Sequence, residues 1–223
     1  MASPARKPDP KPAPSTARGQ RTRAALIAAA RTVFERDGYL DARLTDITQQ
    51  AQTATGSFYT YFTNKEEVFA AVLEEAQEEM LHPHVREVVG DEDPIAVIEA
   101  SNRAYLEAYA RNAKLMRLLE QVATIDPDVR ELRRRRGLLF AERNAASIRD
   151  LQQRGLADPD LDPVLAARAL SSMVGRMANS VYVLGDEVEQ DALVATLTRL
   201  WANALRLPLP DPPKRRRQPR SVR

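Results

Sequence analysis

Residues 44–65 read LTDITQQAQTATGSFYTYFTNK and carry the clearest structural signal in the chain. Two short stretches with helical spacing flank a polar break. This pattern is typical of a helix-turn-helix, whose second helix lies in the major groove of DNA. Such a helix needs small polar residues at its start, and the candidates are Thr55, Gly56, Ser57 and Thr60. It needs aromatic or basic residues near phosphates, and the candidates are Tyr59, Tyr61 and Lys65. A short core helix with three aromatic side chains is the alternative interpretation.

The residues around this stretch resemble one protein family. From Arg21 the order RTRAALIAAARTVFERDGYLDARLTDITQQAQTATGSFYTYFTNKEEVFAAVL is similar to the DNA-binding region of the TetR family of bacterial one-component transcription regulators. The resemblance covers roughly residues 19–75, and the remainder matches only in length and in its all-helical pattern. The matching landmarks, in order, are Ala29-Ala30, Phe34, Gly38-Tyr39, Thr45-Asp46-Ile47, Gly56-Ser57-Phe58-Tyr59, Tyr61-Phe62 and Lys65-Glu66.

The turn between the two short helices departs from the family pattern. Family members usually carry Gly, an aliphatic residue and Ser or Thr there, whereas this chain has Gln52, Thr53 and Ala54. Gly is favoured because the position tends to need a positive φ, which a Cβ makes costly. Ala54 cannot accept the N-cap hydrogen bond that a Ser would, a loss of about 1 kcal/mol. Thr53 or Thr55 could cap instead, which moves the predicted helix start by one residue in either direction.

The resemblance implies the function and the roles of individual residues. It implies a homodimer that binds a palindromic DNA operator and represses transcription until a small lipophilic ligand enters the body. Base edges would be faced by Thr55, Gly56, Ser57 and Thr60. Phosphates would be held by Thr45, Tyr59, Tyr61 and Lys65, with backbone or minor-groove contacts from Arg18, Arg21 and Arg23. Because Ser and Thr bond to either kind of base, DNA shape should contribute to specificity. Two alternatives to a repressor are an activator and a module of the same fold with little specific DNA binding.

Composition argues against several other functions. The chain has 223 residues and 43% hydrophobic content, enough to bury a good core in one or two domains. It has no Cys, which excludes disulfides, a thiolate metal site and a Cys nucleophile. His82 and His84 flank Pro83, which predicts a helix-ending turn rather than a metal pair. No Gly-rich phosphate loop or paired acid motif stands out, so we expect no enzymatic activity, metal or cofactor.

The charges are distributed unevenly along the chain. Before Gln20, four basic residues and one aspartate give a net charge of +3. From Arg206 onward, seven basic residues and one aspartate give +6, which leaves the body at −7 although the whole chain carries +2. Nucleic-acid affinity must therefore come from local geometry and from the tails.

No segment approaches the about 18 apolar residues of a membrane span, and the start lacks the apolar region of a signal peptide. We expect a cytoplasmic protein without membrane contact.

Prolines and capping residues divide the chain into helices. Asp93-Pro94, Asp126-Pro127 and Asp162-Pro163 each read as an N-cap followed by Pro at the first helical position. Asn64 and Glu67 read as a capping box. No window alternates with period two for long enough to predict a strand, so the fold class is all-α. The predicted helices are residues 19–37, 44–51, 55–61, 64–82, 93–110, 112–123, 127–154, 162–184 and 189–205.

These helices predict two folded domains between two disordered basic, Pro-rich tails, residues 1–18 and 206–223. Residues 19–64 form a three-helix helix-turn-helix head, joined to a larger ligand-binding and dimerisation body at 65–205. In the head, the predicted inward stripe of the first helix is Leu26, Ala29, Ala30, Val33 and Phe34. The side chains expected to pack onto this stripe are Leu40, Leu44, Ile47, Phe58 and Phe62.

The last two predicted helices have apolar residues on more than one face, interleaved with small residues. A surface helix usually has a single apolar stripe, so this pattern predicts a self-complementary two-fold interface that forms a four-helix bundle. Two central helices of a monomer are the alternative. The predicted dimerisation residues are Leu170, Val174, Ala178, Val181, Leu197 and Trp201.

The family resemblance also implies that the body binds a small ligand among its helices. Aromatic and Met side chains that could line such a cavity are Tyr105, Tyr109, Met116, Leu119, Phe140, Met173, Met177 and Tyr182, with ordinary core as the alternative. Arg136 interrupts an apolar stripe. If buried it would need a carboxylate, such as Glu107 or Glu120, or an anionic ligand group. The plainer interpretation is that Arg133–Arg136 is a solvated face with its aliphatic stems against the protein.

Overall fold

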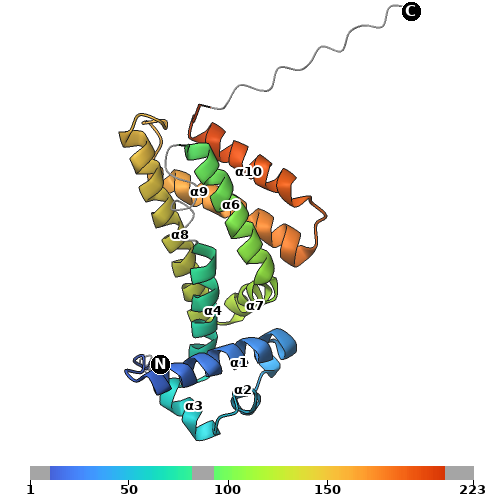
Figure 1. Ribbon diagram of the computed structural model, residues 1–223. Coiled ribbons are helices and arrows are strands. Elements are labelled where there is room, and N and C mark those ends of the chain that lie inside the picture. The colour runs from blue at the N-terminus through green and yellow to red at the C-terminus, as the bar shows by residue number, and fades with distance from the viewer. Residues whose placement is uncertain (1–10, 82–92, 209–223) are drawn as a thin grey trace, which may run out of the picture.

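The chain folds into a small helical head and a larger helical body (Figure 1). The computed structural model describes residues 11–81 and 93–208. Within these ranges every regular element is a helix and no strand occurs, so the predicted all-α class is confirmed. The elements are α1 (Ala17–Asp41), α2 (Leu44–Gln50), α3 (Thr55–Tyr61), α4 (Lys65–Leu81), α6 (Pro94–Arg111), α7 (Ala113–Ile125), α8 (Pro127–Gln153), α9 (Pro163–Asn179), the π-helical turn η1 (Ser180–Leu184) and α10 (Gln190–Ala204).

Side-chain caps set where the body helices begin. The carboxylates of Asp93, Asp126 and Asp162 each accept hydrogen bonds from two main-chain N–H groups in the first turn of α6, α8 and α9. Each is followed by Pro in that turn, where the missing N–H costs no helical hydrogen bond. The three predicted N-caps are confirmed, and each of these helices begins one residue after its cap.

The end of α1 is shaped by Gly38, whose φ of +80° breaks the regular helix. The turn points Tyr39 inward, where its ring packs against Phe34 and Phe69 with centroid distances of 5.8 and 4.8 Å. The next side chain, Leu40, then faces solvent and is 71% exposed. The predicted packing of Leu40 in the core is therefore wrong.

The core of the head otherwise matches the predicted stripe. All five predicted residues of the first helix are buried, and Leu44 packs against them half-buried. Ile47 of α2 and Phe58 of α3 are fully buried, as is Phe62, which follows α3. The rings of Phe58 and Phe62 lie 5.5 Å apart, so α3 is held to the head by aromatic packing.

Two helices join the head to the body. α4 leaves the head and packs on α1, α6 and α8, as its upward course in Figure 1 shows. α7 packs on α1 as well as on α8. α9 lies along α8, and α10 lies along α6. The predicted helix 162–184 is interrupted, because its last turn is the π-helical η1, which ends at Gly185 with a φ of +90°.

Some predictions concern residues outside the described ranges. They are the His82–Pro83–His84 turn, the end of the helix predicted over 64–82, and most of both basic tails. Among the residues that the structure does describe, no helix is long and apolar enough to cross a membrane. The same residues contain no cluster of His, Asp and Glu suited to a metal ion.

Candidate nucleic-acid interface and ligand cavity

The turn before α3 has the backbone that the sequence predicts. Gln52 has a φ of +52°, in the region that Gly adopts without strain. Its amide donates to the Gln49 carbonyl at 3.0 Å, and the amide of Thr53 donates to the Thr48 carbonyl at 2.9 Å. The turn of the helix-turn-helix therefore forms without Gly, at the cost of a left-handed residue that carries a Cβ.

The recognition helix begins at Thr55, as the sequence predicts, although no side chain caps it. Ala54 occupies the N-cap position and has no side-chain acceptor. Neither neighbouring Thr takes its place. Thr55 Oγ1 lies 3.3 Å from Thr48 Oγ1 of α2, and Thr53 Oγ1 is buried with no hydrogen-bond partner among the described residues. The helix start is therefore fixed by the turn and by aromatic packing rather than by a cap.

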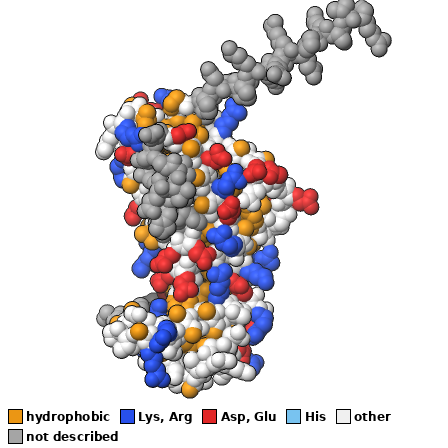
Figure 2. Space-filling model, in the orientation of Figure 1, with side chains coloured by type: hydrophobic (Ala, Val, Ile, Leu, Met, Phe, Trp, Pro, Cys, Tyr) orange, Lys and Arg blue, Asp and Glu red, His pale blue; other side chains and the backbone are white. Residues whose placement is uncertain are grey.

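The two faces of α3 differ sharply. One face is buried through Phe58, while Thr55, Gly56, Tyr59 and Thr60 are exposed. The head is the lower part of Figure 2, where Lys and Arg side chains lie on the left and at the right edge of an otherwise uncharged visible surface, and acidic side chains gather between head and body. Three of the four residues predicted to face base edges thus lie on one exposed, uncharged surface, and the fourth, Ser57, is half-buried at its margin.

Gly56 lies in the first turn of α3, where the protein itself does not require Gly. Its φ is not in the left-handed region, and a Cβ built at this position would meet no atom within 4 Å. Gly is unfavourable inside a helix relative to Ala. The bare backbone at Gly56 therefore leaves room for another molecule to approach the exposed face of α3 closely.

The residues predicted to contact phosphates differ in how far their side chains are exposed. Thr45 is exposed in the first turn of α2, and Arg18 and Arg21 are exposed near the start of α1. Tyr61 is half-buried. The guanidinium of Arg23 lies over the ring of Phe62, 5.2 Å from its centroid, so that this side chain also packs the head.

Lys65 has a different role from the predicted phosphate contact. Its Nζ donates to three main-chain carbonyls, those of Tyr39 at 2.8 Å, Leu40 at 3.1 Å and Ala42 at 3.2 Å. It also lies 4.8 Å from the centroid of the Tyr39 ring. An ammonium group has three N–H donors, and all three are used. We therefore replace the predicted phosphate contact by a structural one, in which Lys65 satisfies the carbonyls at the end of α1.

The segment before α1 lies against the turn between α3 and α4. The main-chain N–H of Lys11 donates to Glu67 Oε1 at 2.7 Å, and Lys11 Nζ donates to the Tyr59 carbonyl. Glu67 Oε2 accepts from the Thr63 amide at 2.5 Å, and Asn64 Oδ1 accepts from the Glu67 amide at 2.8 Å. The predicted capping box is thus present, with Thr63 in place of Asn64 as the donor to Glu67. Lys11 lies in a Pro-rich stretch, and no motif there predicted these contacts.

The body contains a cavity of about 790 Å³. Helices α4, α6, α7, α8, α9 and α10 all contribute side chains to its wall. The predicted residues that line it are Tyr105, Tyr109, Met116, Leu119, Arg136 and Phe140. Met173, Met177 and Tyr182 do not line it, and instead pack half-buried against the hydrophobic core.

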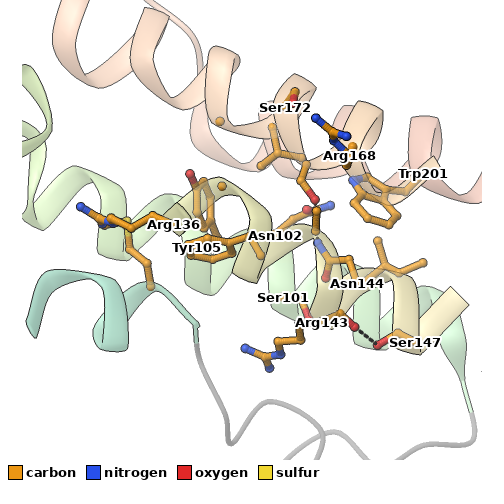
Figure 3. A pocket seen from close by; sticks show the side chains of 18 of the residues that line it. Ser101, Asn102, Tyr105, Arg136, Arg143, Asn144, Ser147, Arg168, Ser172 and Trp201 are labelled. Atoms are coloured by element: carbon orange, nitrogen blue, oxygen red, sulfur yellow. Dashed lines mark hydrogen bonds between the residues drawn. The ribbon is translucent and has the colours of Figure 1, made fainter. Parts of the chain in front are cut away.

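Polar side chains that the sequence did not single out line the same cavity. Asn102 donates through Nδ2 to Thr198 Oγ1 at 3.2 Å, and Asn144 donates to Ser171 Oγ at 2.8 Å. Figure 3 shows Ser101, Asn102 and Asn144 among the side chains of the cavity. Polar residues on a helix usually face solvent, so nothing in their spacing distinguished them.

Two tyrosines form part of the cavity wall. The ring of Tyr105 meets Phe140 edge-on at 5.6 Å, and Tyr109 Oη accepts a hydrogen bond from Asn179 Nδ2 at 3.3 Å. Burial raises the pKa of both Tyr105 and Tyr109. Both phenols are therefore neutral at physiological pH and keep an O–H that can donate.

Arg136 differs in burial from the other three residues of the run Arg133–Arg136. The first three are exposed, and the Arg133 guanidinium pairs with Glu120 at 2.7 Å. Arg136 is only 6% exposed and lines the cavity, so the solvated-face interpretation is wrong for this residue. Desolvation lowers its pKa to about 10, which leaves it charged near neutral pH. Its Nη1 is buried without a hydrogen-bond partner among the described residues.

The predicted dimerisation residues are not available for contact between protomers. Leu170, Val174, Ala178, Leu197 and Trp201 are buried within one chain, and Val181 is half-buried. These buried residues lie on the faces of α9 and α10 that pack on α8 and α6, so they do not form the predicted interface. The exposed apolar and small residues of α9 and α10 are Val164, Leu165, Ala169, Ser172, Ala192, Ala195, Thr196 and Leu200.

Comparisons with known proteins agree with this architecture. The sequence model of the bacterial regulatory proteins of the tetR family matches residues 26–72, which include α2 and α3. The model of the C-terminal domain of the transcriptional regulator EthR matches residues 98–206, which include most of the cavity wall. The two models together span both the head and the body.

Relatives in other bacteria are transcription regulators. The HTH-type transcriptional regulator UidR of Escherichia coli K12 is 24% identical over 151 residues, 68% of this chain and 76% of UidR. The HTH-type transcriptional repressor SCO4008 of Streptomyces coelicolor is 29% identical over 181 residues, 77% of this chain and 88% of SCO4008. The crystal structure of a TetR-family transcriptional regulator from Mesorhizobium loti shares the fold, with a TM-score of 0.72 and 21% identity over 84% of this chain and 98% of that one. This chain belongs to the TetR family and is a DNA-binding transcription regulator with a C-terminal ligand-binding domain.

Proposed function

We propose that the protein is a homodimeric repressor that binds a palindromic operator and leaves it when a small molecule occupies the cavity. The observation that carries this proposal is the exposed, uncharged face of α3, where Gly56 leaves its backbone open to close approach. Residues 19–64 act as the reading head, and residues 65–205 form the ligand-binding and dimerisation body. We assign no catalytic step and no cofactor. Residues proposed to meet base edges are Thr55, Gly56, Ser57 and Thr60, and those proposed to meet phosphates are Thr45, Tyr59, Tyr61, Arg18, Arg21 and Arg23.

Dimerisation is proposed to use the exposed faces of α9 and α10. Leu165 and Leu200 are exposed there beside Ala and Ser side chains, which allow helices to approach closely. A two-fold axis through such a surface pairs four helices into a bundle. Two heads then contact DNA together and double the number of phosphates that the protein neutralises. The body has a net negative charge and cannot contribute such contacts.

The switch is proposed to act through α4 and α7. Both helices pack on α1 of the head, and both contribute to the cavity wall, α4 through Met80 and α7 through Met116 and Leu119. A ligand that binds better to one spacing of the two heads shifts the population toward that spacing. α7 thus gives the cavity a second contact with the head, beside that of α4.

Replacing Gly56 by Ala should affect stability and DNA binding in opposite directions. The Cβ meets no atom of the protein and improves helix propensity, so the free energy of unfolding should rise by about 0.5–1 kcal/mol. The same Cβ occupies space that DNA would need, so affinity for a duplex enriched from a random pool by the wild-type protein should fall about tenfold, a loss of about 1.4 kcal/mol. Urea unfolding and fluorescence anisotropy with labelled duplex measure the two effects.

Gly137→Ala is the matched control, because Gly137 of α8 also has open space around its Cβ position. It should stabilise the protein by a similar amount and leave DNA affinity unchanged. If Gly56→Ala bound the duplex as tightly as wild type, α3 would not approach DNA as proposed, and an interaction module with little specific DNA binding would fit better.

A further inference from the structure

The cavity is rich in cations although the body as a whole is acidic. Among the described residues, its wall carries seven arginines against the carboxylates of Glu120 and Asp150. Most of these arginines are exposed at its margin, and Arg133 pairs with Glu120. This distribution differs from that of the body as a whole, whose net charge is −7. The exposed arginines are solvated or paired at the surface, so the buried one is the charge that needs a separate explanation.

Arg136 is the one buried member of this set. Its side chain comes from α8 and lies close to Tyr105 in Figure 3. It is 6% exposed, its Nη1 has no hydrogen-bond partner in the described part of the chain, and no described carboxylate forms an ion pair with it. Glu107 is exposed and Glu120 is engaged by Arg133, so neither carboxylate considered from the sequence neutralises it. Among the described residues only the Glu74 carboxylate acts on this charge, and it does so from beyond ion-pair distance. An incompletely compensated buried charge is costly, which points to an anion that the described residues do not provide.

The groups around Arg136 are also donors. The hydroxyl of Tyr105 lies at the cavity wall, 3.4 Å from where a Cβ of Gly175 would sit. Tyr109 Oη accepts from Asn179, which leaves its O–H free to donate into the cavity. The cavity wall therefore offers a guanidinium and two phenol hydroxyls as hydrogen-bond donors. A carboxylate has two oxygens that accept from a guanidinium in a bidentate arrangement and from neighbouring hydroxyls.

The other side chains of the cavity wall determine which groups the ligand can carry besides its anion. Apolar side chains also line the cavity, among them Val97, Ile98, Leu119 and Val174. Trp201 lies at the other end of the view in Figure 3, and its buried Nε1 also lacks a hydrogen-bond partner among the described residues. The cavity thus combines one buried positive charge, a wall of apolar and uncharged polar side chains, and a second unused donor.

We propose that the effector is a monoanionic amphiphile whose carboxylate binds Arg136 and whose apolar body fills the cavity toward Trp201. The proposal rests on the proposed function, because it names the chemistry of the ligand that the body binds. One buried guanidinium compensates one negative charge, so a dianionic head would leave a charge uncompensated. A neutral hydroxyl could accept a hydrogen bond from Arg136 but would leave its charge uncompensated.

The test compares three probes that share one tail: decanoate, decan-1-ol and decylammonium. Wild-type protein without DNA should bind decanoate about thirtyfold or more tightly than decan-1-ol, measured by isothermal titration calorimetry below the micellar range. Decylammonium should bind more weakly than either. In Arg136→Met, which keeps a long apolar side chain, the preference for decanoate over decan-1-ol should disappear.

Arg134→Met is the matched control, because Arg134 lies on the same helix at the cavity margin but is exposed and paired with Glu131 at 2.7 Å. It should keep the full preference for decanoate. Ligand-free Arg136→Met should also melt at a higher temperature than wild type, because the substitution removes an incompletely compensated buried charge. This second readout shows that the variant is folded.

Two results would overturn the proposal: equal affinity of wild type for decanoate and decan-1-ol, or an undiminished preference for decanoate in Arg136→Met. Neither depends on DNA. If wild type prefers decanoate to decan-1-ol but binds no duplex specifically, the result supports the anionic ligand and contradicts the repressor function. If specific DNA binding is found without the preference, the repressor function stands and the ligand chemistry falls.

Discussion

Leu200→Glu will convert the protein into a folded monomer and lower its affinity for a two-half-site operator by about a hundredfold or more. Leu200 is 44% exposed on α10, on the surface proposed for the two-fold interface. A carboxylate there would be buried against its own symmetry mate, and an unpaired buried charge is strongly destabilising. A single head also makes half the phosphate contacts, so the dependence of affinity on salt should weaken by about half. Analytical ultracentrifugation and anisotropy titrations at several salt concentrations measure both effects.

Leu139→Glu separates this effect from a general effect of surface charge. Leu139 is 50% exposed on α8, outside the proposed interface. The variant should remain a dimer with wild-type affinity for the operator. A monomeric wild-type protein, or a Leu200→Glu variant that remains dimeric, would contradict the assignment of the interface to the outer faces of α9 and α10.

Phe58→Ala will lower the free energy of unfolding by about 3–5 kcal/mol, because it empties the space of a fully buried ring in the small core of the head. Its ring packs 5.5 Å from that of Phe62, so the loss also loosens the residue that ends α3. Specific DNA binding should be lost with it. Urea unfolding followed by far-UV circular dichroism measures the change in stability.

Leu40→Ala is the control for this prediction. Leu40 is exposed, and removing it should change stability by less than about 0.5 kcal/mol. A comparable loss of stability in both variants would mean that the packing described for the head is incorrect.

Features set by local chemistry were predictable from the sequence. Asp followed by Pro predicted the start of three body helices, because a carboxylate satisfies N–H groups of the first turn and Pro needs none. The departure of the turn at Gln52 from the family pattern correctly indicated a strained residue, seen as its positive φ. The all-helical class and the start of α3 followed from spacing in the same way.

Features set by tertiary contacts were not predictable. Apolar residues on two faces of α9 and α10 did not indicate which face packs inside the protomer, so Trp201 was placed at the wrong surface. Lys65 follows α3 closely in sequence, but its three carbonyl partners lie at the end of α1, more than twenty residues away. Arg136 lies in a run of four arginines, and only the packing of α8 shows which of them is buried.

The central claim is that two α3 helices read DNA as a symmetric pair. Selection of bound sequences from a pool of random duplexes, at physiological salt, tests it most directly. We expect enrichment of one palindrome, whose half-sites are separated by about one helical turn or a multiple of it and are bound by two protomers. Salt-sensitive binding without enrichment of any sequence would show that the basic tails alone drive association, and would contradict the claim.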